Sequence, residues 1–278
     1  MRIISVILTA MLMSTSAWSN MEVLFHPYDS TLKKIAKIFE EAEETIDMAL
    51  YNVDAGKGNP IIRTLTSDAV QKRIQSGDLK VRIIFEGYES PEANQRKMKK
   101  LEAIGIDARF MGSSKKMHHK FATVDTAGKN PKLITGSANW SLGSRNLYNE
   151  SLLFIDSMPG ITQSFQSEYD LLWGLAKEYG FSVDYKETNV KPVAMEDGVD
   201  AFYNTDHFKV SNSGRLTSSR SDTSFTLTRK IVEAIDSAES KIEIATTRLK
   251  LRPIYEACLL YTSPSPRDAT LSRMPSSA

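Results

Sequence analysis

Short apolar runs alternate with longer amphipathic segments along most of the chain up to residue 180. The apolar runs are typical of β-strands, the first ending in a turn, and occupy residues 22–29, 45–53, 79–87, 106–111, 119–125, 132–137 and 150–156. Apolar residues at helical spacing predict helices at residues 30–45, 59–77, 90–105 and 160–180. Alternation of this kind predicts a layered α/β fold.

A polar segment interrupts this alternation and marks a predicted domain boundary. Residues 186–200 surround Pro192 and are mostly polar, so we interpret them as a linker. The linker separates a first domain, residues 20–185, from a shorter segment, residues 201–258.

The segment after the linker resembles an earlier part of the chain. Residues 231–249 align with residues 35–53 at a constant offset of 196 positions. Five aligned pairs are identical: Ile35 with Ile231, Ala42 with Ala238, Glu43 with Glu239, Ile46 with Ile242, and Ala49 with Ala245. The alignment predicts a partial second repeat with the same helix and strand. The alternative is a chance likeness between two amphipathic units.

The N-terminus has the pattern of an export signal. Arg2 precedes the apolar run Ile3–Met13, and Ala17 and Ser19 occupy the positions typical of a signal-peptidase site. An uncleaved membrane anchor is the alternative, but the apolar run is shorter than the ~20 residues that a spanning helix needs. We therefore expect residues 1–19 to be a signal peptide and the protein to be secreted or periplasmic.

The C-terminal residues have a different character from the rest of the chain. Residues 259–278 are rich in Ser, Pro and Arg and show no apolar periodicity. They resemble translated sequencing-adapter sequence, so we interpret them as a non-native tail and leave them out of the fold prediction. We expect the native protein to continue beyond this point.

Composition and charge limit the class of protein. The chain has 278 residues, 41% of them hydrophobic and 25% charged, which is typical of a soluble globular protein and excludes a fibrous or disordered chain. The net charge of +1 indicates no general preference for nucleic acid or anionic membranes. Residues 113–120 are locally basic and could attract an anionic phosphodiester. The single cysteine, Cys258, cannot form an internal disulfide.

The strongest chemical pattern lies between residues 118 and 150. Along the chain it comprises His118, Lys120, Asp125, the turn Gly136-Ser137-x-Asn139, and Glu150. Residues i and i+2 of a strand project to the same face, so His118 and Lys120 should lie together while His119 points the other way. Each residue alone would be ordinary surface or turn chemistry; together they supply an imidazole, a cation and neutral donors, which are groups suited to phosphate.

This set resembles the HKD motif of the phospholipase D superfamily. The likeness covers residues 20–180, and residues 198–258 resemble part of a second repeat. It implies an α/β/α sandwich with a mixed β-sheet, made of one complete repeat and the start of another.

The resemblance also implies roles for individual residues. His118 would attack phosphorus and form a phosphohistidine, with Glu150 orienting its ring. Lys120, Ser137 and Asn139 would bind the phosphate oxygens. Asp125 belongs to the same catalytic set, and because it lies about five residues or ~17 Å along the strand from Lys120, we interpret it as structural support.

The sequence departs from the family pattern in two respects. Ten residues separate Asp125 from Gly136, which predicts a longer hairpin loop than is usual. More importantly, the chain carries one copy of the full motif, whereas family members pair two so that a second histidine protonates the leaving oxygen. We therefore expect the chain alone to have little activity.

The predicted function is that of a phospholipase D-type phosphodiesterase, which hydrolyses or transfers a phosphatidyl group. Its partners would be a phospholipid or another phosphodiester substrate, with transient contact to a membrane surface; a homodimer is left open. No side chains cluster at the spacing of metal ligands, so we expect neither metal nor cofactor. Two alternatives stay open: a nuclease of the same superfamily that acts on nucleic acid, and a catalytically silent binding module.

Overall fold

The computed structural model describes residues 20–87, 90–111, 117–177, 194–203, 208–210, 216–218 and 225–262. The predicted signal peptide, most of the predicted linker and residues 263–278 lie outside these ranges, so the predictions made for them stay predictions. Contacts divide the chain into two units, Met1–Asp200 and Ala201–Ala278, which are described separately.

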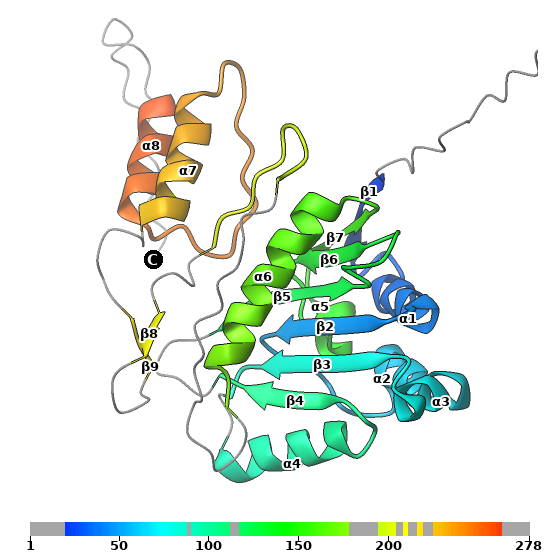
Figure 1. Ribbon diagram of the computed structural model, residues 1–278. Helices are drawn as coiled ribbons and strands as arrows, with labels where there is room; N and C mark the ends of the chain where they lie inside the picture. Colours follow the sequence, from blue (N-terminus) through cyan, green and yellow to red (C-terminus); the bar gives the residue numbers. More distant parts are fainter. Residues whose placement is uncertain are drawn as a thin grey trace, which may run out of the picture. The chain divides into compact units, whose positions relative to one another are not determined.

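The first unit is built on a seven-stranded mixed sheet (Figure 1). Its strands are β1 (Asn20–His26), β2 (Thr45–Leu50), β3 (Lys80–Phe85), β4 (Asp107–Phe110), β5 (Lys120–Val124), β6 (Lys132–Gly136) and β7 (Glu150–Asp156). Their order across the sheet is β1-β7-β6-β5-β2-β3-β4. The pairs β2–β3 and β3–β4 are parallel and the other pairs are antiparallel. The predicted α/β fold with a mixed sheet is confirmed.

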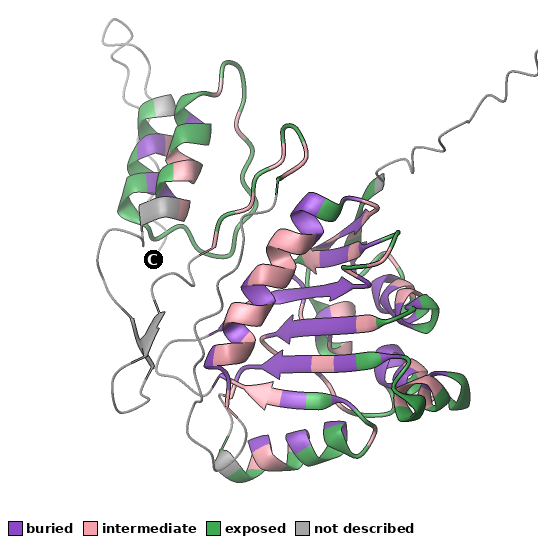
Figure 2. Ribbon diagram, in the orientation of Figure 1, coloured by how far each residue is buried: buried purple, intermediate pink, exposed green. Residues whose placement is uncertain are grey.

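Helices cover both faces of this sheet. Helix α6 (Pro159–Leu175) lies across one face, as Figure 1 shows. On the other face, α1 (Thr31–Glu41) and α2 (Pro60–Leu65) contribute apolar side chains to the main hydrophobic core. Helix α4 (Pro91–Glu102) packs near the edge strand β4. Figure 2 shows the central strands buried between these layers.

Strand β2 illustrates how the sequence produces the two layers. Ile46 and Met48 alternate along the strand and join the core beneath α1 and α2. Asp47 points to the opposite face, where it accepts two hydrogen bonds from the Arg82 guanidinium, both 2.7 Å long. Gln166 of α6 donates to the same carboxylate at 2.8 Å. These hydrogen bonds hold α6 against the sheet. They also pair the buried Asp47 charge, which would be costly to bury alone.

Two local predictions about helices need correction. Residues 59–77 form two helices, α2 and α3 (Asp68–Ser76), where the sequence predicted one. The break occurs at Thr66, whose hydroxyl donates to the carbonyl of Ile62 at 2.9 Å, and at Ser67, whose extended backbone begins α3. Helix α5 (Leu142–Leu147) was not predicted, because six residues are too few to show a helical period.

The second unit does not contain the predicted repeat strand. Its described elements are the hairpin β8 (Phe208–Val210) and β9 (Leu216–Ser218) and the helices α7 (Phe225–Asp236) and α8 (Arg252–Thr262). Helix α7 agrees with the predicted helix, but residues 241–249 form no strand and are largely exposed. Within the described residues, no neighbouring strand pairs with this segment, and an unpaired apolar run cannot form a sheet.

Candidate active site

Strand pairing brings the predicted site residues to one end of the sheet. Lys120 pairs with Leu50 at the end of β2, and the amide of Tyr51 donates to the carbonyl of His119 at 2.7 Å. The end of β6 and the start of β7 lie at the same end of the sheet, because Gly136 pairs with Leu152. Residues from distant parts of the chain therefore meet where these strands end.

His118 and Lys120 form the centre of this end of the sheet. The Lys120 Nζ atom lies 3.1 Å from Nδ1 of His118 and donates to the His118 carbonyl at 2.9 Å. His118 is exposed to solvent, whereas Lys120 is only 6% exposed. Burial lowers the pKa of Lys120 to about 8, against the opposing effect of the Glu150 carboxylate. A cation is thus held beside an accessible imidazole.

Tyr51 completes the surroundings of this pair and was not predicted as a site residue. Its ring centroid is 4.4 Å from that of His118, with an angle of 50° between the rings. The Lys120 Nζ atom lies 5.2 Å from the same Tyr51 ring, at cation–π distance. The only signal in the sequence was an aromatic residue directly after an apolar strand, which is too common to indicate a site.

The Gly-Ser-x-Asn turn is held closely against β7. A Cβ on Gly136 would lie 2.2 Å from the Ser151 carbonyl oxygen, and the Gly136 φ angle is +154°, so glycine is required there. Ser137 donates its amide to the Ser151 carbonyl at 2.9 Å, and its Oγ accepts from the Ser151 amide at 3.0 Å. The hydroxyl of Ser137 is exposed and keeps its own proton for donation.

Asn139 contributes a buried polar atom next to this turn. Its Oδ1 is buried and has no hydrogen bond among the described residues. Leaving such a group unpaired costs about 1–3 kcal/mol. The next residue, Trp140, is fully buried in the main core and acts as a packing residue.

Glu150 begins β7 and lies opposite the end of β1. Its strand partner is His26, a buried histidine whose Nε2 is hydrogen-bonded to the Thr31 hydroxyl. Burial lowers the pKa of His26, while the backbone of Ser144 and the charge of Glu150 act to raise it. The Glu150 charge also acts on Lys120, which places the carboxylate within electrostatic reach of the proposed phosphate-binding cation.

Asp125 lies at the other end of β5, away from His118. Its carboxylate accepts hydrogen bonds from three successive backbone amides: Glu43 at 2.7 Å, Glu44 at 2.7 Å and Thr45 at 3.0 Å. These amides lead into β2, so Asp125 fixes the start of that strand. The structure therefore does not bring Asp125 together with the other members of the predicted catalytic set, and its contacts are those of a positioning residue.

His119 faces the opposite side of the sheet from His118. Its Nε2 lies 3.1 Å from Oε1 of Glu168, a buried carboxylate on α6. Its ring also packs edge-on against Phe121, with centroids 5.4 Å apart. These contacts join β5 to α6 and leave His119 outside the candidate site.

Glu86 is a second residue that the sequence analysis did not identify. It follows β3, is 2% exposed, and its Oε2 accepts from the Met117 amide at 2.7 Å. Met117 directly precedes His118, so this bond fixes the chain where it enters the site. A buried carboxylate bonded to a loop 31 positions away cannot be recognised from spacing alone.

Two kinds of feature are absent from the described part of the chain. It contains no group of three or more His, Cys, Asp or Glu side chains placed to hold a metal ion. Among the same residues, no helix combines the length and apolar character needed to span a bilayer.

The mixed sheet and the residues gathered at its end define an α/β protein with a candidate phosphodiester site. A family model described as "Cardiolipin synthase, PLD-like domain" matches residues 35–173, which is half of the chain. The chain therefore belongs to the phospholipase D superfamily through this PLD-like domain.

Curated relatives match the same part of the chain. The mitochondrial cardiolipin hydrolase of Xenopus tropicalis is 31% identical over 145 residues, covering 52% of this chain and 62% of that protein. The mitochondrial cardiolipin hydrolase of Chlamydomonas reinhardtii is 25% identical over 148 residues, covering 53% of this chain and 60% of that protein. The chain thus spans about six tenths of the length of these relatives.

Two solved structures resemble the chain. The phospholipase D family member Nuc from Salmonella typhimurium has a TM-score of 0.48 and 20% identity, covering 58% of this chain and 98% of that one. NucT from Helicobacter pylori has a TM-score of 0.44 and 18% identity, covering 57% and 98%.

Proposed function

We propose that this protein is a phosphodiesterase that reacts through a phosphohistidine at His118. The observation that carries the proposal is the contact between Lys120 Nζ and His118 Nδ1, 3.1 Å long, at the end of the sheet that also carries the exposed Ser137. Phosphoryl transfer depends mainly on positioning a nucleophile and stabilising charge on the phosphate oxygens. An accessible imidazole beside a buried cation provides both.

The contact between His118 and Lys120 also indicates how the substrate would enter. A charged lysine only donates hydrogen bonds, so Nδ1 of His118 is the acceptor and the ring proton is on Nε2. A phosphate oxygen that accepts a hydrogen bond from the Lys120 ammonium would draw it away from Nδ1. The ring proton could then move from Nε2 to Nδ1. Nε2 would then be free to attack, while the proton stays on Nδ1 and is donated in a hydrogen bond to Glu150, the role that the family resemblance implies for this carboxylate.

The reaction would proceed in two displacements. The His118 nitrogen forms a bond to phosphorus, the bond from phosphorus to the leaving oxygen breaks, and that oxygen takes a proton. Water or an alcohol then attacks the phosphohistidine and releases the histidine. Water as the acceptor gives hydrolysis, and an alcohol gives transfer.

We further propose a phosphatidyl group as the substrate and an exported location. The substrate proposal is supported by the family match and the cardiolipin hydrolase relatives, and export by the pattern of residues 1–19. A nuclease of the same superfamily is the second candidate, because the same displacement at phosphorus serves nucleic acid. A silent binding module is the third, because the chain carries one full motif.

The test is to trap the covalent intermediate with bis(4-nitrophenyl) phosphate. Its leaving group departs as a stabilised phenolate and needs no proton from a second histidine. We expect a burst of one nitrophenolate and, in peptides from rapidly quenched enzyme, a His118 adduct that carries the remaining 4-nitrophenyl phosphoryl group, both absent from His118→Ala. A folded protein that gives neither burst nor adduct would favour the silent binding module.

A further inference from the structure

A groove of about 530 Å³ begins next to the candidate active site. Its walls are the loop at residues 52–56, which follows β2, one side of α4, and residues 141–143 at the start of α5. The groove lies wholly within the first unit. None of its residues belongs to the predicted HKD set.

The groove is strongly basic. Helix α4 contributes Arg96, Lys97 and Lys100, and Asp54 is the one carboxylate among the described residues that line it. Arg96 and Lys100 are exposed, and among the described residues neither forms an ion pair, although the Arg96 charge acts on the Glu92 carboxylate one turn earlier in α4. Lys97 Nζ lies 5.2 Å from the ring of Phe85, a buried residue at the end of β3. Three cations thus face one open space.

Contacts within the first unit connect the groove wall to the candidate active site. Asn52 directly follows Tyr51, whose ring packs against His118, and Val53 forms an isolated bridge with Trp140. Asn59 is fully buried, and its Nδ2 donates to the Trp140 carbonyl at 2.9 Å and to the Asp54 carbonyl at 3.2 Å. These bonds join the groove wall to the segment that follows Asn139. Through Tyr51 and these hydrogen bonds, the groove wall is connected to the segments that carry His118 and Asn139.

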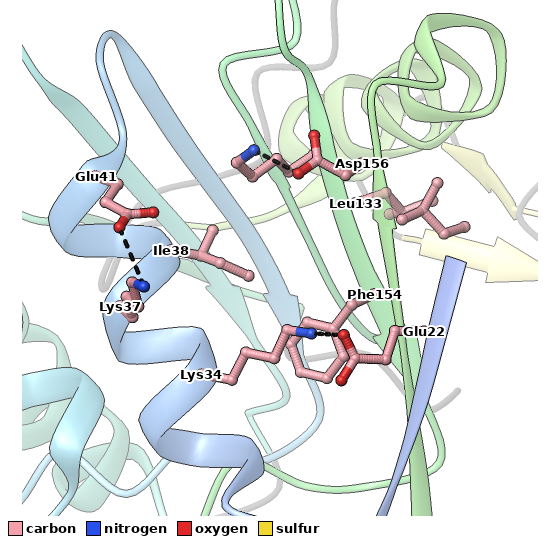
Figure 3. A pocket seen from close by; sticks show the side chains of 10 residues that line it. Glu22, Lys34, Lys37, Ile38, Glu41, Leu133, Phe154 and Asp156 are labelled. Atoms are coloured by element: carbon pink, nitrogen blue, oxygen red, sulfur yellow. Dashed lines mark hydrogen bonds and ion pairs between the residues drawn. The ribbon is translucent and has the colours of Figure 1, made fainter. Parts of the chain in front are cut away.

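Another pocket of the first unit shows that a cluster of lysines alone is not an anion site (Figure 3). It lies beside α1 and contains Lys34, Lys37 and Lys132. Each lysine pairs with a carboxylate of the same pocket, to Glu22, Glu41 and Asp156 respectively. Its charges are neutralised by the protein itself, whereas the groove beside α4 has a surplus of positive charge.

We propose that the groove binds a second phosphate of the same substrate molecule, next to the phosphate that reacts at His118. Cationic side chains bind phosphate oxygens by charge-assisted hydrogen bonds, and Arg96 can bind two oxygens at once. The proposal rests on the proposed function and adds a substrate class: molecules with at least two neighbouring phosphodiesters. Two sources carry that chemistry, a lipid such as cardiolipin and an oligonucleotide strand.

The experiment measures binding without turnover, in the His118→Ala background of the full chain. The lipid arm compares vesicles of cardiolipin with vesicles of phosphatidylglycerol at equal total phosphate. The nucleotide arm compares a trinucleotide, which has two phosphodiesters, with a dinucleotide, which has one. In the arm that represents the natural source, we expect about tenfold tighter binding of the two-phosphate ligand, the effect of one charge-assisted contact.

Charge reversal identifies the groove as the cause. Arg96→Glu with Lys100→Glu should abolish the preference, whereas Lys72→Glu with Lys99→Glu should keep it, because these exposed lysines lie outside the groove and the change in net charge is the same. The proposal is overturned if neither arm shows a preference, if the preference survives reversal in the groove, or if the control pair removes it equally. Failure of the proposed function is seen separately, as the lack of a nitrophenolate burst with His118 intact.

Discussion

The ammonium of Lys120 and the imidazole of His118 hold each other in place before any substrate is present. The Lys120 Nζ atom lies 3.1 Å from His118 Nδ1, and it also donates to the His118 carbonyl at 2.9 Å. The aromatic ring of Tyr51 lies against both side chains. The geometry links the charge of Lys120 to the reactivity of His118.

This link predicts a loss of activity at moderately alkaline pH. Burial lowers the pKa of Lys120 to about 8, so the free enzyme loses this positive charge as the pH rises through that value. If the reaction needs the Lys120 ammonium, its rate is retained below pH 8. Above pH 8, kcat/KM should fall about tenfold per pH unit. The measurement is the pH profile of kcat/KM with bis(4-nitrophenyl) phosphate.

A Lys120→Arg variant supplies the control for this profile. The guanidinium stays charged across the range, so the variant should be slower but should lack the alkaline decrease. A wild-type profile that is flat to pH 10 would show that the charge of Lys120 is not required.

The two neighbouring histidines should differ in what they contribute. His118→Ala should abolish the covalent intermediate with little change in stability, because the side chain is exposed. His119→Ala should leave kcat unchanged and cost about 1–3 kcal/mol of unfolding free energy, because the buried Glu168 loses a partner. His119→Gln keeps a donor and should recover part of the loss. Denaturant unfolding and single-turnover kinetics separate the two effects, and the reverse pattern would contradict the site assignment.

Asp125 should behave as a structural residue despite its place in the motif. Asp125→Asn tolerates the positive φ of 51° but weakens the bonds to the amides of residues 43–45. We expect a loss of about 1–3 kcal/mol in unfolding free energy. The kcat of the folded fraction should not change. A large fall in kcat at unchanged stability would contradict this prediction and show that Asp125 takes part in catalysis.

Gly136 should tolerate no side chain. Ala at this position would bring its Cβ to 2.2 Å from the Ser151 carbonyl oxygen, so β6 and β7 must separate where Ser137 and Asn139 enter the site. Overpacking of this kind costs about 1–3 kcal/mol, and activity should fall with it. Gly143→Ala is the matched control, since its Cβ would meet nothing within 4 Å. Equal melting temperatures for the two variants would argue against this reading of the turn.

The sequence predicted the sheet well because the signal for a strand is local. The run at residues 150–156 became β7 with the same bounds, and the runs around β5 and β6 were within one residue of the observed strands. The strand predicted within residues 241–249 was wrong, although it aligns with β2. Strand β2 has hydrogen-bonded neighbours on both sides, and pairing partners are a tertiary property that apolar periodicity does not contain.

The candidate site was predictable only where its residues are close in sequence. His118 and Lys120 follow from strand alternation, and Ser137, Asn139 and Glu150 from the spacing of a known motif. Tyr51 and Glu86 reach the same end of the sheet through the pairing of β2 and β3. No spacing rule relates them to His118, so the structure was needed to find them.

The last prediction concerns the proton that the leaving group needs. An alkoxide is a poor leaving group, and general acid catalysis typically contributes ~10²–10⁴ in rate. Of the other described histidines, His26 is buried and bonded to Thr31, and His119 binds Glu168 on the far face of the sheet. Neither is placed to protonate an oxygen at His118. Nitrophenyl esters should therefore turn over far faster than alkyl esters, by about the same factor of ~10²–10⁴.

Two comparisons decide where any proton comes from. If a second copy of the chain supplies it, the rate with alkyl esters should rise with protein concentration while the nitrophenyl rate per enzyme stays constant. The fourth histidine, His207, begins the sequence His207-Phe208-Lys209 and itself lies outside the described residues. If His207 supplies the proton, His207→Ala should reduce only the alkyl rate. Equal rates for alkyl and nitrophenyl esters, at every concentration and in His207→Ala, would contradict the prediction, because they would mean that leaving-group protonation does not limit this site.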